Sequence, residues 1–86
     1  MVSEKIVVKA KTGLHARPAA QLVALNKSYK SQIIIRNSVK EVNSASMISI
    51  LSLGLKPGTE IEIIAEGEDE TNALRAVLDF FENLTE

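Results

Sequence analysis

The sequence has 86 residues, a formal net charge of −1, no cysteine and a single histidine. This length suits one domain, spanning residues 1–86, and the charge balance argues against a nucleic-acid or membrane-surface binder. Without cysteine there is no disulfide or thiol chemistry, and one histidine leaves metal binding weak, so we expect no metal and no cofactor. No apolar run approaches the roughly 20 residues of a membrane span, so we expect a cytoplasmic protein without membrane insertion. We also expect it to be a monomer.

Hydrophobic periodicity predicts seven secondary-structure elements. In chain order they are a strand at 5–10, a helix from 16 to about 29, strands at 32–36 and 39–42, a helix from 47 to about 53, a strand at 60–66 and a final helix after Asp69. Two of the strand connections pass through helices, so the sheet is not expected to be a simple meander. The order β-α-β-β-α-β-α predicts an α+β domain, with four strands and the helices on one face.

The same periodicity predicts which side chains form the core and how the helices end. Asp69 is a favoured residue type at a helix N-cap, and Gly54 stands where a left-handed residue is expected after a helix. Inward positions of the strands are Ile6, Val8, Ala10, Ile61, Ile63 and Ala65; those of the helices are Ala19, Leu22, Val23, Tyr29, Leu74, Val77, Leu78, Phe81 and Leu84.

The histidine lies directly before the first predicted helix, in the run Gly13-Leu14-His15-Ala16-Arg17-Pro18. We place His15 at the N-cap, so that the free N–H groups of Ala16 and Arg17 point toward the space beside the imidazole. The helix dipole and the guanidinium favour an anion there, most naturally a phosphate. A neutral imidazole can attack a phosphoryl group, which predicts that His15 accepts and donates one.

A plainer interpretation of His15 is a solvated surface residue at a helix end. Histidine is not among the favoured N-caps, however, and it stands where Ser, Thr, Asp or Asn would stabilise the helix more. Local stability does not explain that choice, whereas phosphoryl chemistry does.

Two further stretches are candidates for binding another protein. Ala16, Ala20, Ala24 and Lys27 share one face of the first helix, and small residues there leave room for a partner, although alanine is also a good helix former. The second helix, with Ser46 as its N-cap, is apolar nearly all round, so some of its side chains must be exposed. Met47 and Ile48 are the best candidates, as a loosely covered core edge or as a docking patch.

Two motifs together resemble one family, the histidine-containing phosphocarrier protein HPr of the bacterial phosphotransferase system. The motifs are Gly13 to Ala19, which is similar to the active-site signature, and Val42-Asn43 through Ser46 with Ser52-Leu53-Gly54, which is similar to the signature around a regulatory serine. The resemblance covers essentially the whole chain. It implies an open-faced β-sandwich, a four-stranded antiparallel sheet with three helices on one face, and a phosphocarrier rather than an enzyme.

The resemblance also implies partners and residue roles. His15, through Nδ1, is expected to accept phosphate from phosphorylated enzyme I, which draws on phosphoenolpyruvate, and to pass it to the IIA domain of a sugar-specific enzyme II. Arg17 matches the arginine that contacts the phosphoryl group, and Thr12 matches a hydroxyl residue near it. The residues at the family's docking positions are Ala16, Ala20, Ala24, Lys27, Met47, Ile48 and Leu51.

Ser46 matches a serine that a dedicated HPr kinase/phosphorylase modifies in some relatives, which recruits a transcriptional regulator. The usual run after that serine is Ile-Met-Gly, whereas this chain has Met47-Ile48-Ser49. Two alternatives to the sugar carrier follow: a regulatory HPr-like protein that acts mainly through phosphoserine-46, and a carrier in a nitrogen-related phosphorelay. A nucleic-acid module is disfavoured, because the chain has few aromatic residues and no basic stripe.

Overall fold

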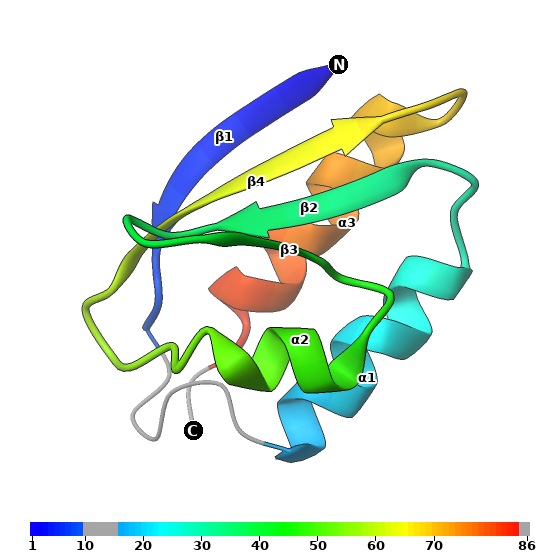
Figure 1. Ribbon diagram of the computed structural model, residues 1–86. Coiled ribbons are helices and arrows are strands. Elements are labelled where there is room, and N and C mark those ends of the chain that lie inside the picture. The colour runs from blue at the N-terminus through cyan, green and yellow to red at the C-terminus, as the bar shows by residue number, and fades with distance from the viewer. Residues whose placement is uncertain (10–15, 85–86) are drawn as a thin grey trace.

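The computed structural model describes residues 1–9 and 16–84 of the chain. Within them, strands and helices follow one another in the predicted order (Figure 1). Their bounds are β1 Val2–Val7, α1 Ala16–Lys27, β2 Gln32–Arg36, β3 Glu41–Asn43, α2 Met47–Ser52, β4 Glu60–Glu66 and α3 Glu70–Glu82. Helix α1 ends two residues before the predicted position, because the amides of Ser28 and Tyr29 donate to carbonyls only three residues back.

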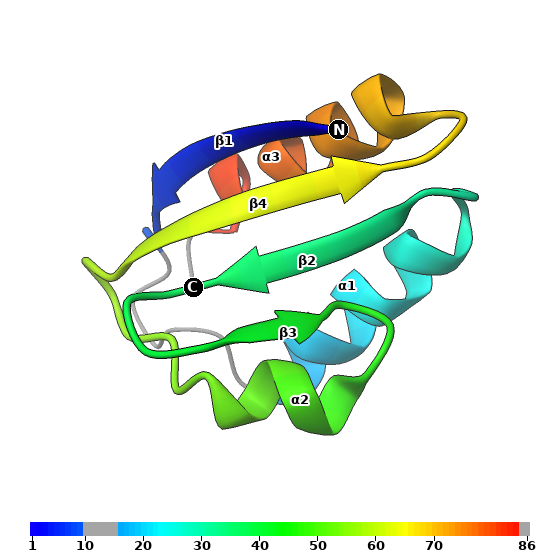
Figure 2. The same ribbon diagram turned by 45° about the horizontal axis from the view of Figure 1, so that its top comes forward.

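The strands form an antiparallel sheet in the order β1-β4-β2-β3. Strand β4 comes last in the sequence but lies between β1 and β2, so the sheet is not a meander. Figures 1 and 2 show α1, α2 and α3 on the same face of this sheet. The predicted α+β open-faced β-sandwich is therefore confirmed.

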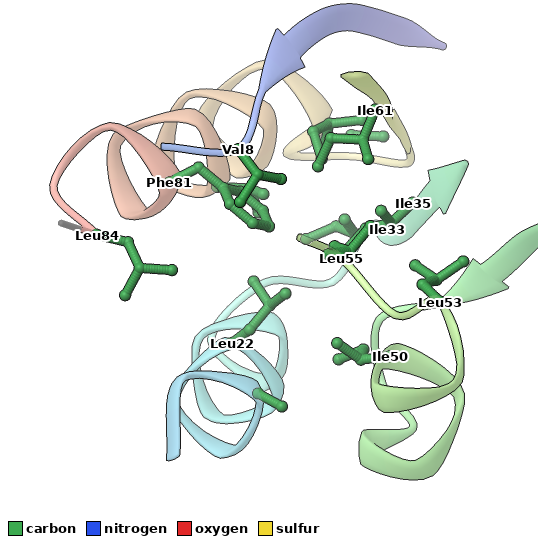
Figure 3. Packing of buried hydrophobic residues seen from close by; sticks show 14 of the residues in the cluster. Val8, Leu22, Ile33, Ile35, Ile50, Leu53, Leu55, Ile61, Phe81 and Leu84 are labelled. Carbon is green, nitrogen blue, oxygen red and sulfur yellow. The ribbon is translucent and has the colours of Figure 1, made fainter. Parts of the chain in front are cut away.

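The core lies between the sheet and the helices (Figure 3). Alternate residues of β2 and β4 are buried against it, as the period of two requires. Helix α3 supplies Ala73, Val77 and Phe81, whereas the predicted Leu74 and Leu78 are half-buried at its flanks. The largest fully buried side chains come from every layer: Val8, Leu22, Ile33, Ile35, Ile50, Ile61, Ile63 and Val77.

Strand β1 begins and ends earlier than the predicted 5–10. Its ladder with β4 pairs Val2 with Ala65 and Val7 with Glu60. After Val7 the chain leaves the ladder, and the Val8 amide donates instead to the carbonyl of Thr59 at 2.9 Å. The prediction failed at the start because an edge strand needs little hydrophobic alternation when its partner supplies the backbone hydrogen bonds. Ala10 lies outside the described residues.

Strand β3 also differs from its prediction, because residues 37–40 form a tight turn. The Asn37 side-chain oxygen accepts hydrogen bonds from the amides of Val39 and Lys40, both at 2.8 Å. This turn holds Val39 out in solvent, 84% exposed, and delays the strand to Glu41. An asparagine that binds its own backbone two residues on explains the shift.

Asp69 occupies the N-cap of α3 as predicted, but its side chain does not cap the helix. Its carboxylate accepts hydrogen bonds from the Lys30 amide at 3.0 Å and from the amide and hydroxyl of Ser31. These bonds, the hydroxyl first, hold the pKa of Asp69 below its usual range. The aspartate therefore ties the turn before β2 to the turn before α3.

Candidate functional site

The predicted phosphate site is described from Ala16 onward, since Thr12 and His15 lie outside the described residues. Ala16 begins α1, as predicted, and Arg17 follows with an exposed side chain. Pro18 is buried in the first turn, where its missing N–H costs no helical hydrogen bond. The first turn contains no acidic residue, so no carboxylate on it offsets the positive end of the helix dipole.

One face of α1 is exposed along its whole length. Ala16, Ala20, Ala24 and Lys27 are all exposed, whereas Leu22 on the other side is fully buried. The spacing of four, four and three residues puts the exposed set on one side of the helix. The structure therefore confirms that these small residues face outward, with Lys27 adding a positive charge in the last turn.

Helix α2 begins and ends as its sequence predicts. Ser46 is its N-cap in an extended conformation, and its hydroxyl accepts a hydrogen bond from the Ser49 amide at 3.3 Å. Gly54 follows the helix with a φ of +59°, the left-handed conformation that glycine adopts without steric cost.

The exposed side chains of α2 differ in part from the predicted pair. Ile48 is 82% exposed, as expected, but Met47 is half-buried and packs against the core. Leu51, which follows Ile48 by three residues and is one of the expected docking positions, is 37% exposed. A flexible methionine at the start of a helix can lean back onto the core, whereas Ile48 and Leu51 share the outer side.

The exposed sides of α1 and α2 belong to neighbouring helices. Both ribbon views show α2 beside α1, and Leu22 and Ile50 meet the shared core between them (Figure 3). We select the small, apolar and cationic residues among the exposed side chains of these two helices and call them the α1–α2 face. Its residues are Ala16, Arg17, Ala20, Ala24, Lys27, Ile48 and Leu51.

The α1–α2 face differs in charge from the rest of the described surface. Helices α1 and α2 contain no Asp or Glu, and the face carries the cations Arg17 and Lys27. By contrast, β4 and α3 carry six carboxylates and one basic residue, Arg75. A face with exposed apolar side chains, small residues and only positive charge suits a partner surface that is apolar and acidic.

One contact beside this face joins residues that the sequence patterns did not single out. Ser44 is fully buried, and its hydroxyl donates to the Asn26 side-chain oxygen at 2.6 Å. Asn26 lies one turn after Leu22 on the inward side of α1. A polar residue at an inward helical position was the available signal, because buried polar groups are almost always hydrogen-bonded.

A hollow of about 360 Å³ lies elsewhere, over the β1–β4–β2 part of the sheet. Lys5, Arg36 and Glu62 line it, and no residue of the α1–α2 face does. The hydrogen bond from Arg36 is the main cause that lowers the pKa of Glu62.

Across the described ranges, we find no group of three His, Cys, Asp or Glu placed to hold a metal ion. None of the helices in those ranges is long and apolar enough to cross a membrane.

Comparison with known proteins gives consistent matches over most of the chain. A family model described as "PTS HPr component phosphorylation site" matches residues 2–83. The HPr-like protein Crh of Bacillus subtilis (strain 168) is 43% identical over 74 residues, covering 86% of this chain and 87% of Crh.

Solved structures agree with the sequence matches. The crystal structure of HPr-C-His from Thermoanaerobacter tengcongensis matches with a TM-score of 0.90 and 43% identity, covering 95% of this chain and 92% of that one. The crystal structure of Bacillus subtilis Crh, described as a dimer with a swapped domain, has a TM-score of 0.78 and 37% identity. It covers 100% of this chain and 99% of Crh.

Proposed function

Because this chain belongs to the HPr family of the phosphotransferase system, we propose that it carries a phosphoryl group on His15 from phosphorylated enzyme I to the IIA domain of a sugar-specific enzyme II. The observation that carries the proposal is the start of α1. It follows His15 directly in the sequence, presents Arg17 to solvent and has no acidic residue in its first turn.

The transfer is a displacement at phosphorus. A ring nitrogen of neutral His15, Nδ1 by analogy with the family, forms a bond to phosphorus while the bond from phosphorus to the donor breaks. The second transfer exchanges these roles, with the IIA domain as acceptor. The Arg17 guanidinium and the first amides of α1, that of Ala16 among them, stabilise the charge on the phosphoryl oxygens, and Thr12 supplies a hydroxyl nearby. The chain is unchanged after one cycle, as a carrier is.

Both partners use the α1–α2 face in turn in this proposal. Ile48 and Leu51 provide apolar contact, the alanines of α1 allow close approach, and Lys27 and Arg17 pair with carboxylates of the partner. Half-buried Met47 packs against the core, so in this proposal it meets the partner only with its exposed edge. The exposure of Ile48 and the absence of acidic residues from both helices support this use of the face.

The test is incubation with enzyme I and phosphoenolpyruvate. The native chain should acquire an acid-labile phosphate, and His15→Ala should abolish it. Arg17→Ala should slow the transfer about 100-fold, the usual effect of losing one electrostatic donor. Arg75→Ala is the matched control, since Arg75 is an exposed arginine on α3, and it should transfer at the native rate. Labelling that persists in His15→Ala contradicts the proposal.

A second candidate function is regulation through Ser46, which the similarity to the HPr-like protein Crh favours. The Ser46 side chain stands at the start of α2, two residues before Ile48 in the sequence, so a phosphate there would add negative charge at the helix that carries part of the α1–α2 face. Treatment with HPr kinase/phosphorylase and ATP, followed by mass spectrometry, tests it. Modification of Ser46 and capture of a transcriptional regulator would favour this function. If Ser46 stays unmodified, the regulatory function is contradicted and the phosphocarrier function is the one that stands.

The identity of the partner and the oligomeric state have separate tests. A panel of IIA domains distinguishes a sugar carrier from a carrier in a nitrogen-related phosphorelay by which domain accepts the phosphate. We propose that the chain acts as a cytoplasmic monomer, with β1 paired to β4 of the same chain. Since Crh has been crystallised as a swapped dimer, a mass measurement in solution is the appropriate check.

A further inference from the structure

We propose that the hydrogen bond between Ser44 and Asn26 positions α2 against α1, so that these two residues set the geometry of the α1–α2 face for docking. The inference rests on the proposed docking function of that face. Neither side chain belongs to the face: Ser44 is buried and Asn26 is half-buried. Both are therefore positioning residues.

Ser44 joins three elements at one point. Its amide donates to the Ile33 carbonyl of β2 at 2.9 Å, and its hydroxyl donates to Asn26 of α1 at 2.6 Å. Two residues later, Ser46 begins α2 as its N-cap. The start of α2 is thus held at a defined place relative to both the sheet and α1.

The apolar contacts between the helices do not provide that precision. Leu22 and Ile50 pack at the shared core, but apolar burial is non-directional and tolerates small sliding of one helix along the other. A buried hydrogen bond is directional, and an unpaired hydroxyl at that depth would be costly. Over the described ranges, Ser44–Asn26 is the side-chain hydrogen bond that links α1 to the turn between β3 and α2.

The far end of α2 is tied to a different part of the molecule. The Asn37 side-chain amide donates to the Leu53 carbonyl at a long 3.4 Å, and Lys40 donates to the Ser52 hydroxyl at 3.0 Å in an exposed position. These contacts join α2 to the β2–β3 turn and say nothing about α1. The relation between the helices is accordingly set at the Ser44 end.

A small displacement there would reach the docking residues directly. Asn26 is adjacent to Lys27 and one half-turn from Ala24, and Ser44 lies four residues before Ile48. The residues of α1 and those of α2 must meet one partner surface together. If α2 shifts relative to α1, binding therefore weakens without any change in the chemistry at His15. The expected signature is a raised KM for the partner with an unaltered kcat.

The first test compares Ser44→Ala with Ser31→Ala in phosphoryl transfer from enzyme I. Ser31 is also buried and also donates its hydroxyl to another side chain, but its partner Asp69 lies in the turn before α3, so this bond does not join α1 to the chain that leads into α2. Ser44→Ala should raise KM about fivefold, equivalent to about 1 kcal/mol, and leave kcat within about twofold. Ser31→Ala should lower stability and leave KM unchanged. Equal KM values for the two variants would overturn the inference.

The second test separates positioning from stability. In Ser44→Ala/Asn26→Leu, apolar side chains replace both partners, so no buried group is left unpaired and the melting temperature should return toward the native value. KM should nevertheless stay raised, because the directional bond is missing. A KM that recovers together with stability would show a merely structural role and overturn the inference. Failure of the native chain to accept phosphate would instead overturn the proposed function, and the inference with it.

Discussion

Helices α2 and α3 bury very different shares of their apolar surface. Helix α3 places Ala73, Val77 and Phe81 in the core and turns its other side, which carries Arg75 and Asp79, to solvent. Helix α2 buries Ile50 but leaves Ile48 almost fully exposed. Every large apolar side chain of α3 is at least half-buried, whereas α2 carries an apolar side chain that the fold leaves in solvent, which is the property of a docking helix.

Charged residues on the side of α3 are paired within the molecule, whereas those on the side of α1 and α2 are not paired with carboxylates of these helices. On the side of α3, ion pairs join Lys9 to Glu82 and Lys30 to Glu68, and the Asp69 carboxylate joins two turns. Helices α1 and α2 contain no carboxylate that could form such pairs. One side of the molecule therefore satisfies its charges internally, and the other presents cations for a partner.

The largest expected effect is on the stability supplied by α3. Phe81→Ala removes a buried aromatic ring and should cost about 3–5 kcal/mol of unfolding free energy, measured by urea denaturation. Below its lowered melting temperature, the variant should keep the native KM for enzyme I. A loss below about 1 kcal/mol would mean that α3 is not the better-buried helix.

Two glycine substitutions compare the turns beside the same helices. Gly67 precedes α3 with a φ of +149°, and a Cβ there would lie 2.7 Å from the Ser31 Cα, so Gly67→Ala should cost more than about 1 kcal/mol. Gly54 follows α2 with open space around it, so Gly54→Ala should cost only about 1 kcal/mol of left-handed strain. Thermal unfolding of both variants measures the difference, and the opposite order would contradict the contrast.

The third prediction concerns binding rather than folding. Ile48→Ala should leave the unfolding free energy within about 0.5 kcal/mol of the native value, since the side chain is exposed. It should raise KM for enzyme I about tenfold, as truncation of an apolar anchor does. Val39→Ala is the control, because Val39 is equally exposed but lies in the β2–β3 turn, and its KM should be native. Equal KM values would remove Ile48 from the face.

The smallest effect is the pH dependence carried by Asp69. Its pKa is lowered in the folded chain, so its contribution to stability is complete above the unfolded pKa of about 3.9 and is lost as pH falls toward the folded value. Asp69→Asn should therefore lower the melting temperature at neutral pH and flatten its fall in acid. The melting temperature of this variant should still fall somewhat in acid, because the pKa of Glu70 is also lowered in the folded chain. If the melting temperature of Asp69→Asn fell with pH as steeply as that of the native chain, Asp69 would not be the source of this pH dependence.

Strong periodicity made much of the fold predictable. Strands β2 and β4 have the predicted bounds because alternating or β-branched residues mark them from end to end. Ser46 and Gly54 marked the two ends of α2 through preferences of single residues. The bounds of the edge strands were harder to predict. Pairing with β4 sets the limits of β1, and the turn made by Asn37 sets the start of β3.

The exposed residues of the candidate site could be predicted from the sequence, but the buried contact that positions its helices, between Ser44 and Asn26, could not. Alanines at helical spacing indicated the open side of α1, and an all-apolar short helix indicated that α2 must be exposed. Leu51 was among the expected docking positions through the family resemblance, but how far Met47 turns inward depended on how α2 lies on the core and did not follow from the residue pattern. The positions of Thr12 and His15 remain a prediction.

Local patterns in the sequence determined the order and type of the elements, the inward faces and the helix start beside the only histidine, because each depends on residues a few positions apart. Tertiary structure alone decided that β4 lies between β1 and β2, that Asp69 binds a distant turn instead of its own helix, and that Ser44 meets Asn26. Those contacts join residues 18 to 63 positions apart, and only the packed chain brings such residues together.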